Sequence, residues 1–165
     1  FDAGHSKITW SINHLGFSTY TGQFAAVSGA LTLDPAKPTA ASLDVTVDTT
    51  SLGTLNPALD AHLKSADFLN VAAFPTATFR ATGVKLTGER TALITGDLTL
   101  HGVTRPVVVE ATFNQAGVNP LDKTYSLGFD GKAVIKRSEF GITAYVPAVG
   151  DEVTLTIEAE LKRIG

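Results

Sequence analysis

Residues 153–161 read VTLTIEAEL, and their side chains alternate between apolar and polar over the whole stretch. In a β-strand, successive side chains point to opposite faces of the sheet, so this stretch has one apolar face and one wet face. Such alternation is typical of antiparallel strands that cover a core on one side only. The stretch therefore predicts a long, half-buried strand.

The same period of two recurs along the rest of the chain, with turn signals such as DPAKP (34–38) and AGVNP (116–120) between the runs. About eight short-linked strands with no strand–helix rhythm predict an all-β, antiparallel sandwich or closed barrel. Runs of about ten residues favour an up-and-down barrel over a sandwich. The alternating runs are residues 8–13, 31–34, 43–48, 97–100, 107–113, 125–130 and 153–161.

One stretch breaks the alternation and predicts a short helix over residues 57–65. Asn56 is a good N-cap, and Leu59 and Leu63 lie four residues apart on one face. We expect this helix, with the aromatic segment 68–74 that follows it, to act as a lid across one end of the barrel.

Composition limits the class of protein. A length of 165 residues predicts a single domain over 1–165. The net charge of −3 argues against nucleic-acid binding. Cysteine is absent, which removes disulfides and thiolate metal sites. No apolar run approaches the ~18 residues of a transmembrane segment. The first residue is Phe1 and not Met, so we expect a removed signal peptide and a periplasmic or secreted protein.

The apolar faces of the predicted strands mix large and very small residues. Phe129 continues into Gly131 and Ala133, and Val109 continues into Ala111. Missing side chains on an inward face leave room for a ligand, but small packed barrels show the same mixture. The pattern alone leaves a cavity and a filled interior equally open.

Residues suited to catalysis or metal binding form no recognised motif. The four histidines do not stand at zinc-binding spacings, so no metal site is predicted. Asp60 and His62 are two apart on a helix and do not face each other, and no G-x-S-x-G elbow is present. We therefore predict no catalytic residues. The cations suited to a polar head group at a barrel mouth are Arg105, Lys123, Lys136 and Arg137.

A series of short motifs, in order along the chain, carries a resemblance to a known family. They are DAGHSKI (2–8), HLG (14–16), GQF (22–24), DAHLKSADF (60–68), FPTATF (74–79), GDLTLHGVTRP (96–106), RSEFGI (137–142) and DEV (151–153). With these motifs the chain resembles the YceI-like family, the lipocalin-like polyisoprenoid-binding domain, from Asp2 to Leu161. One departure is the lack of an aromatic residue near Val27 or Ser28.

The resemblance implies an eight-stranded antiparallel lipocalin-like barrel with an elongated apolar cavity. It implies a long apolar lipid as ligand, namely a polyisoprenoid, an isoprenoid quinone or a related long-chain amphiphile. It further implies a non-catalytic carrier or store without a cofactor, often exported and often a homodimer.

On this basis we expect the small inward residues to leave room for a cavity. We also expect two groups of ligand contacts. The cavity wall is expected to comprise Ile8, Trp10, Ile12, Leu43, Val45, Phe79, Leu98, Leu100, Val107, Val109, Phe113, Phe129, Phe140, Leu155 and Ile157. The head-group candidates are Arg105, Arg137, Asp60 and His62, with Arg137 and Asp60 alternatively forming an ion pair.

Two alternatives stay open. The chain could be an interaction or scaffold barrel with a filled interior, or an enzyme acting on a lipid head group through His62 or His101 with Asp60. Enlarging Ala111 to Phe separates a hollow barrel from a filled one, because overpacking a filled core costs ~1–3 kcal/mol.

Overall fold

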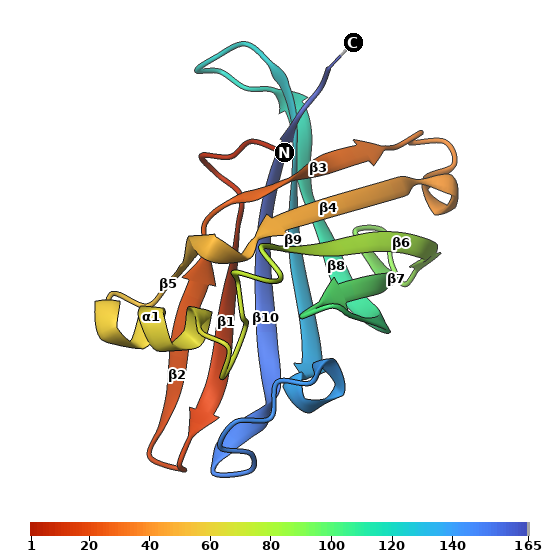
Figure 1. Cartoon of the computed structure of the whole chain (residues 1–165). Coiled ribbons are helices and arrows are strands. Elements are labelled where there is room, and N and C mark those ends of the chain that lie inside the picture. The colour runs from red at the N-terminus through yellow and green to blue at the C-terminus, as the bar shows by residue number, and fades with distance from the viewer. Residues whose placement is uncertain (165) are drawn as a thin grey trace.

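The computed structural model describes residues 1–164 and shows one antiparallel sheet of ten strands with one α-helix (Figure 1). The strands are β1 (Lys7–His14), β2 (Ser18–Phe24), β3 (Val27–Thr32), β4 (Ser42–Asp48), β5 (Leu52–Gly53), β6 (Thr76–Leu86), β7 (Thr91–Leu100), β8 (Val103–Val118), β9 (Tyr125–Lys136) and β10 (Val149–Lys162). The helix is α1 (Pro57–Lys64), and the 3₁₀ turns are η1 (Pro38–Ala40), η2 (Thr49–Ser51) and η3 (Arg137–Phe140). Within residues 1–164, no helix is long and apolar enough to cross a bilayer.

The all-β antiparallel prediction is confirmed, but the predicted number of eight strands is wrong. Two strands escaped the pattern. β2 places Gly22 opposite Trp10, so a glycine interrupts its alternation of large apolar residues. β5 is only two residues long, Leu52–Gly53, which is too short to show a period.

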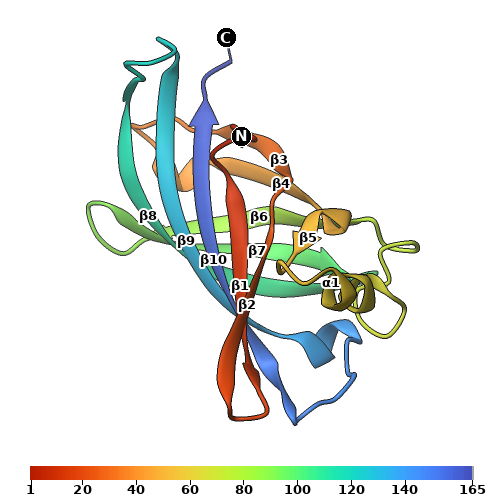
Figure 2. The same cartoon turned by 90° about the vertical axis from the view of Figure 1, so that its left-hand side faces the viewer.

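The sheet curls on itself in the order β3-β4-β6-β7-β8-β9-β10-β1-β2-β5. Figures 1 and 2 show β8, β9, β10, β1 and β2 running along the long axis of the molecule, while β3, β4, β6 and β7 cross it. The result is a curled half-barrel with a concave apolar face.

The predicted helix is confirmed as α1, which ends one residue earlier than expected. The side chain of Asn56 accepts a hydrogen bond from the amide of Leu59 at 3.2 Å, as an N-cap does. Asp60 Oδ1 accepts from the amide of Thr54 at 2.9 Å and from its hydroxyl at 2.5 Å. These bonds fasten α1 to the segment that follows β5, so the helix is held beside the end of β2.

The sheet splits where β8 meets β9. Their pairing begins only at Glu110 and Lys132, so the first half of β8 and the last residues of β9 do not pair with each other. Phe140 of η3 lies in the resulting gap with 1% of its surface exposed, and it packs with Ile135 and Ile142 as the buried core cluster. One bulky ring thus occupies part of the place where the backbone ladder is missing.

A charge arrangement on β10 gives a test of stability against pH. Glu158 stands between Asp130 of β9 and Lys7 of β1. Partial burial and the Asp130 carboxyl raise the pKa of Glu158, against the pull of Lys7. A carboxyl pKa that is higher in the folded protein than in the unfolded chain means that folding favours the protonated carboxyl. Below the unfolded-state pKa this group costs no stability. As the pH rises through the folded-state pKa, the free energy of unfolding falls.

We therefore expect Glu158→Gln to raise the free energy of unfolding near pH 7 and to leave it unchanged below about pH 4. The gain should stay below about 0.5 kcal/mol, because Glu158 is solvent-exposed. Urea unfolding at the two pH values measures it. The control is Glu152→Gln, which stands opposite Lys136 and should give no gain; an equal gain in both variants would contradict the explanation.

Candidate functional site

A pocket of about 770 Å³ lies against the concave face of the sheet. Its wall comes from β1, β2, β7 and β10, with single residues of β4, β5, β6 and β9, from α1 and the segment after it, and from the loop before β10. The lining residues are Ile8, Trp10, Ile12, His14, Leu15, Tyr20, Phe24, Val47, Leu52, Leu59, His62, Leu63, Phe68, Leu69, Ala77, Leu98, Leu100, Ile135, Arg137, Ile142, Tyr145, Ala148, Val149, Val153 and Leu155. Its volume lies within the ~300–1,000 Å³ typical of small-molecule sites.

Strand alternation and register explain why the wall is apolar. Ile8, Trp10 and Ile12 occupy every second position of β1 and all line the pocket. Their register partners on β10 place Leu155 beside Trp10 and Val153 beside Ile12. Two neighbouring strands therefore present a continuous apolar strip to the pocket.

The surface area of the molecule also indicates a wetted inner face. The accessible surface is 9433 Å² for a mass of 17.3 kDa. A compact monomer of that mass exposes about 7,800 Å². The described part of the chain contains only nine buried apolar residues, so much of the inward apolar surface lies against open space.

Gly131, one of the small residues expected to create a cavity, does not leave space. A Cβ atom there would lie 3.2 Å from side-chain atoms of Ile157 and Val109. This glycine accepts side chains from the neighbouring strands, so the interpretation of small residues as cavity is wrong at this position.

The predicted wall residues accordingly divide into three groups. Ile8, Trp10, Ile12, Leu98, Leu100 and Leu155 line the large pocket. Val107 and Phe140 line a separate pocket at the β8–β9 split. The rest line neither pocket; they are Leu43, Val45, Phe79, Val109, Phe113, Phe129 and Ile157. The rings of Phe113 and Phe129, which are paired across β8 and β9, pack against each other in a tilted arrangement with 5.5 Å between centroids.

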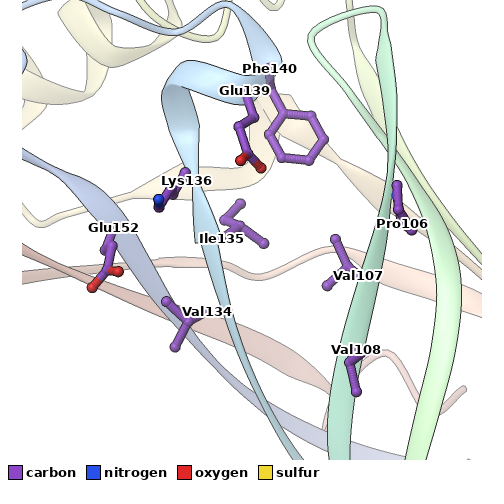
Figure 3. Close-up of a pocket in the computed structure, with 9 residues that line it drawn as sticks. All are labelled: Pro106, Val107, Val108, Val134, Ile135, Lys136, Glu139, Phe140 and Glu152. Atoms are coloured by element: carbon purple, nitrogen blue, oxygen red, sulfur yellow. The ribbon is translucent and has the colours of Figure 1, made fainter.

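The pocket at the split is smaller, about 360 Å³. Figure 3 shows Val107 and Ile135 facing each other across the gap, with the Phe140 ring beside them. Lys136, Glu139 and Glu152 also line it, and Val108 and Val134 are about half exposed there. Its mixed charged and apolar lining differs from that of the large pocket.

Arg137 reaches the wall of the large pocket, but each of its three guanidinium nitrogens donates to a backbone carbonyl of the protein itself. Its Nε, Nη1 and Nη2 donate to the carbonyls of Gly150, Ile142 and Val149 at 2.8, 3.1 and 3.0 Å. Burial lowers the pKa of the guanidinium, and the Asp151 carboxylate opposes that effect. Because the side chain is 5% exposed, its geometry is that of a structural clamp.

The other head-group candidates fall in different places. Asp60 binds Thr54 and does not form the expected ion pair with Arg137. Arg105 is exposed, donates to the carbonyl of Thr104 at 3.2 Å and does not line the large pocket. These two predictions are not supported by the geometry, because local contacts hold both side chains elsewhere.

His62 does line the pocket, at its aromatic rim. Its ring lies 5.0 Å from that of Phe68 and 6.3 Å from that of Tyr145, between centroids. Its Nε2 pairs with Asp67 Oδ2 at 3.1 Å. Apart from the Trp10 indole, the other lining residues with polar side-chain atoms are His14, Tyr20, Arg137 and Tyr145.

The histidines expected in the enzyme alternative have separate partners. Nδ1 of His101 lies 2.9 Å from the carbonyl oxygen of Phe140, and its ring packs 4.9 Å from that of Phe74. His62 pairs with Asp67, and Asp60 binds Thr54. Among the described residues, neither His62 nor His101 forms a hydrogen bond or ion pair with Asp60, so the structure gives no support to this pairing.

A cluster of possible metal ligands lies outside the pocket. Single atoms of Asp2, His5 and Glu160 lie within 4.8 Å of one another. The Lys162 ammonium lies 3.0 Å from Asp2 Oδ2, and bonds from His5, Gly4 and Lys162 hold the pKa of Asp2 far below its usual range. A protein cation already neutralises this carboxylate.

The sequence-based prediction missed most of the pocket-lining residues that lie outside the strands. Leu59 and Leu63 of α1 line the pocket, as do Phe68 and Leu69 after it. Their four-residue spacing and apolar character were visible in the sequence, and only their assignment to a lid kept them out of the expected wall. Tyr145 has no periodic signal, because it lies in an irregular loop.

Known proteins match this chain along nearly its whole length. A family model described as "YceI-like domain" matches residues 1–161. A "UPF0312 protein" of Pseudomonas savastanoi is 46% identical over 138 residues, which cover 84% of this chain and 71% of that protein. One from Ectopseudomonas mendocina is 43% identical over 156 residues, covering 94% and 81%.

Solved structures share the architecture. BcnA of Burkholderia cenocepacia matches with a TM-score of 0.87 at 26% identity, covering 97% of this chain and 98% of that one. The Campylobacter jejuni YCEI protein matches with a TM-score of 0.81 at 30% identity, covering 93% and 91%. A polyisoprenoid binding domain from Saccharophagus degradans matches with a TM-score of 0.76 at 15% identity, covering 99% and 97%, which shows a common fold.

Proposed function

This chain belongs to the YceI-like domain family, and from that premise we propose that it binds a long apolar lipid of the isoprenoid class in its large pocket and carries or stores it without chemical change. The observation that carries the proposal is the pocket of about 770 Å³ with an almost wholly apolar wall. The fold shared with a polyisoprenoid binding domain supports the choice of ligand class.

The energetics favour a hydrocarbon ligand. Burying about 400 Å² of a prenyl chain gives on the order of 10 kcal/mol before the costs of association. The wall offers few hydrogen-bonding groups, so a polar molecule placed there would lose its water contacts without compensation. Methyl-branched or linear hydrocarbon suits such a wall best.

The head group is proposed to lie at the rim and not inside. His62, Tyr145 and His14 offer polar atoms on the less buried part of the lining, whereas Arg137 is engaged with backbone carbonyls. A hydroxyl, quinone carbonyl or phosphate at the rim stays in contact with water. This arrangement makes the site selective for the hydrocarbon chain of the lipid and tolerant of different head groups. The predicted homodimer and the export to the periplasm or beyond stay predictions.

Trp10 provides a direct measurement of binding. It is the single tryptophan of the chain and lines the pocket, and its indole Nε1 is buried without a hydrogen-bond partner among the described residues. We expect prenyl alcohols to change its fluorescence saturably, with affinity rising with chain length until the pocket is full. Mass spectrometry of the native protein identifies any lipid retained from the cell. Absence of both signals would favour the filled scaffold instead.

A further inference from the structure

Two loops lie together at one end of the molecule, beside the rim of the large pocket. They are the β1–β2 turn at residues 15–17 and the loop 141–148 between η3 and β10. The amide of Leu15 donates to the carbonyl of Ala148 at 3.1 Å. Figures 1 and 2 both place them at the end opposite the chain termini. Leu15, Tyr145 and Ala148 also line the pocket, so it reaches the surface between these loops.

The tips of these loops expose apolar side chains. Phe17 is 89% exposed, Tyr145 61% and Leu15 48%. Leu15 and Tyr145 also have positive φ angles, 55° and 62°, in a region that favours glycine or asparagine. A bulky residue in this conformation costs free energy, and such costs concentrate where a residue is needed for function. We call these three residues the loop-tip face.

The loop-tip face lies in segments without formal charge. No Asp, Glu, Lys or Arg occurs from Ile8 to Leu33 or from Phe140 to Gly150. The β8–β9 turn at the other end differs, because its exposed Leu121 is followed by Asp122 and Lys123. Asp67, paired with His62, stands at the α1 side of the rim. An uncharged apolar tip suits the uncharged interior of a bilayer.

We propose that the loop-tip face docks on the surface of a lipid bilayer and inserts Phe17 among the lipids. A prenyl chain then passes between bilayer and pocket without crossing water. Aromatic side chains are favoured at the boundary between headgroups and acyl chains. The three side chains offer a few hundred Å² of apolar surface. This area is well under the ~800 Å² that each partner buries in a stable protein–protein interface, so it suits a bilayer better than a protein partner. This docking rests on the proposed lipid-binding function, since it supplies the route of loading.

Phe17→Ser tests the docking, because Phe17 does not line the pocket. We expect the wild-type protein to sediment with phosphatidylcholine vesicles and Phe17→Ser to partition about tenfold more weakly. Partition should be insensitive to salt, as the face carries no charge. The matched control is Leu121→Ser at the opposite end, 90% exposed, which should partition as the wild type does. Transfer of a fluorescent prenyl lipid between vesicles should slow only in Phe17→Ser.

A second set of readouts keeps the docking separate from the pocket. Prenyl-alcohol titration of Trp10 in vesicle-free solution should give equal affinities for wild type and Phe17→Ser. A normal titration with no vesicle partition would overturn the docking and leave the proposed function standing. Failure of the titration would remove the proposed function, and vesicle sedimentation would still decide the docking. A dimer in sedimentation velocity that Phe17→Ser dissociates would assign the face to a second copy and overturn the proposal.

Discussion

Replacing Arg137 by alanine is expected to lower the free energy of unfolding by roughly 3 kcal/mol or more. The guanidinium is 5% exposed and donates to three backbone carbonyls, those of Gly150, Ile142 and Val149. Removing it leaves these acceptors without their partner and a hole between η3 and β10. A loss of this size is a large part of the 5–15 kcal/mol that stabilises an ordinary domain.

Urea unfolding of Arg137→Ala measures the loss, with Arg105→Ala as the control. Arg105 is exposed and donates to the carbonyl of the neighbouring Thr104, so its removal should change stability by less than about 0.5 kcal/mol. Arg137→Lys should recover only a small part of the loss, because a single ammonium nitrogen cannot reach the three carbonyls that the planar guanidinium contacts through three separate nitrogens. If Arg137→Ala kept wild-type stability and lost affinity only for phosphorylated prenyl lipids, Arg137 would be a head-group ligand after all.

Replacing Ala77 by phenylalanine is expected to weaken prenyl-alcohol binding at least tenfold with little loss of stability. Ala77 of β6 lines the large pocket, so a ring built there grows into space that the ligand needs. Hydrophobic side chains are tolerated where they fill a void and costly where they compress packed neighbours. Titration of Trp10 fluorescence measures the affinity, and thermal unfolding measures the stability.

Ala111→Phe is the matched variant with the opposite expected outcome. Ala111 lies outside the pocket and pairs with Gly131, over which Ile157 and Val109 pack so closely that a Cβ atom on Gly131 would lie 3.2 Å from them. The larger ring should therefore cost ~1–3 kcal/mol of stability, and prenyl-alcohol affinity should stay the same while the protein is folded. If both variants were destabilised equally, the interior would be filled at both positions and the scaffold alternative would be favoured.

Local sequence signals determined the class of structure. Period-two alternation, as in residues 153–161, requires only that one strand face be covered, so it predicted β10 and the antiparallel sheet. The helix at 57–64 followed from Asn56 as N-cap and the spacing of Leu59 and Leu63. The ordered motifs indicated the YceI-like family, and the family model that matches residues 1–161 confirms it. Each of these signals lies within a few neighbouring residues or in their order along the chain.

Only the tertiary structure decided which inward residues face open space. Alternation says that Val109, Ile157 and Trp10 point inward, but the register between strands sets what lies opposite each one. Trp10 meets the pocket, whereas Val109 and Ile157 close over Gly131. Arg137 likewise looks like any cation in the sequence, and its role is set by carbonyls up to thirteen residues away that the turn of η3 brings to it. The physical reason is that packing depends on distances between segments remote in sequence, which no local pattern contains.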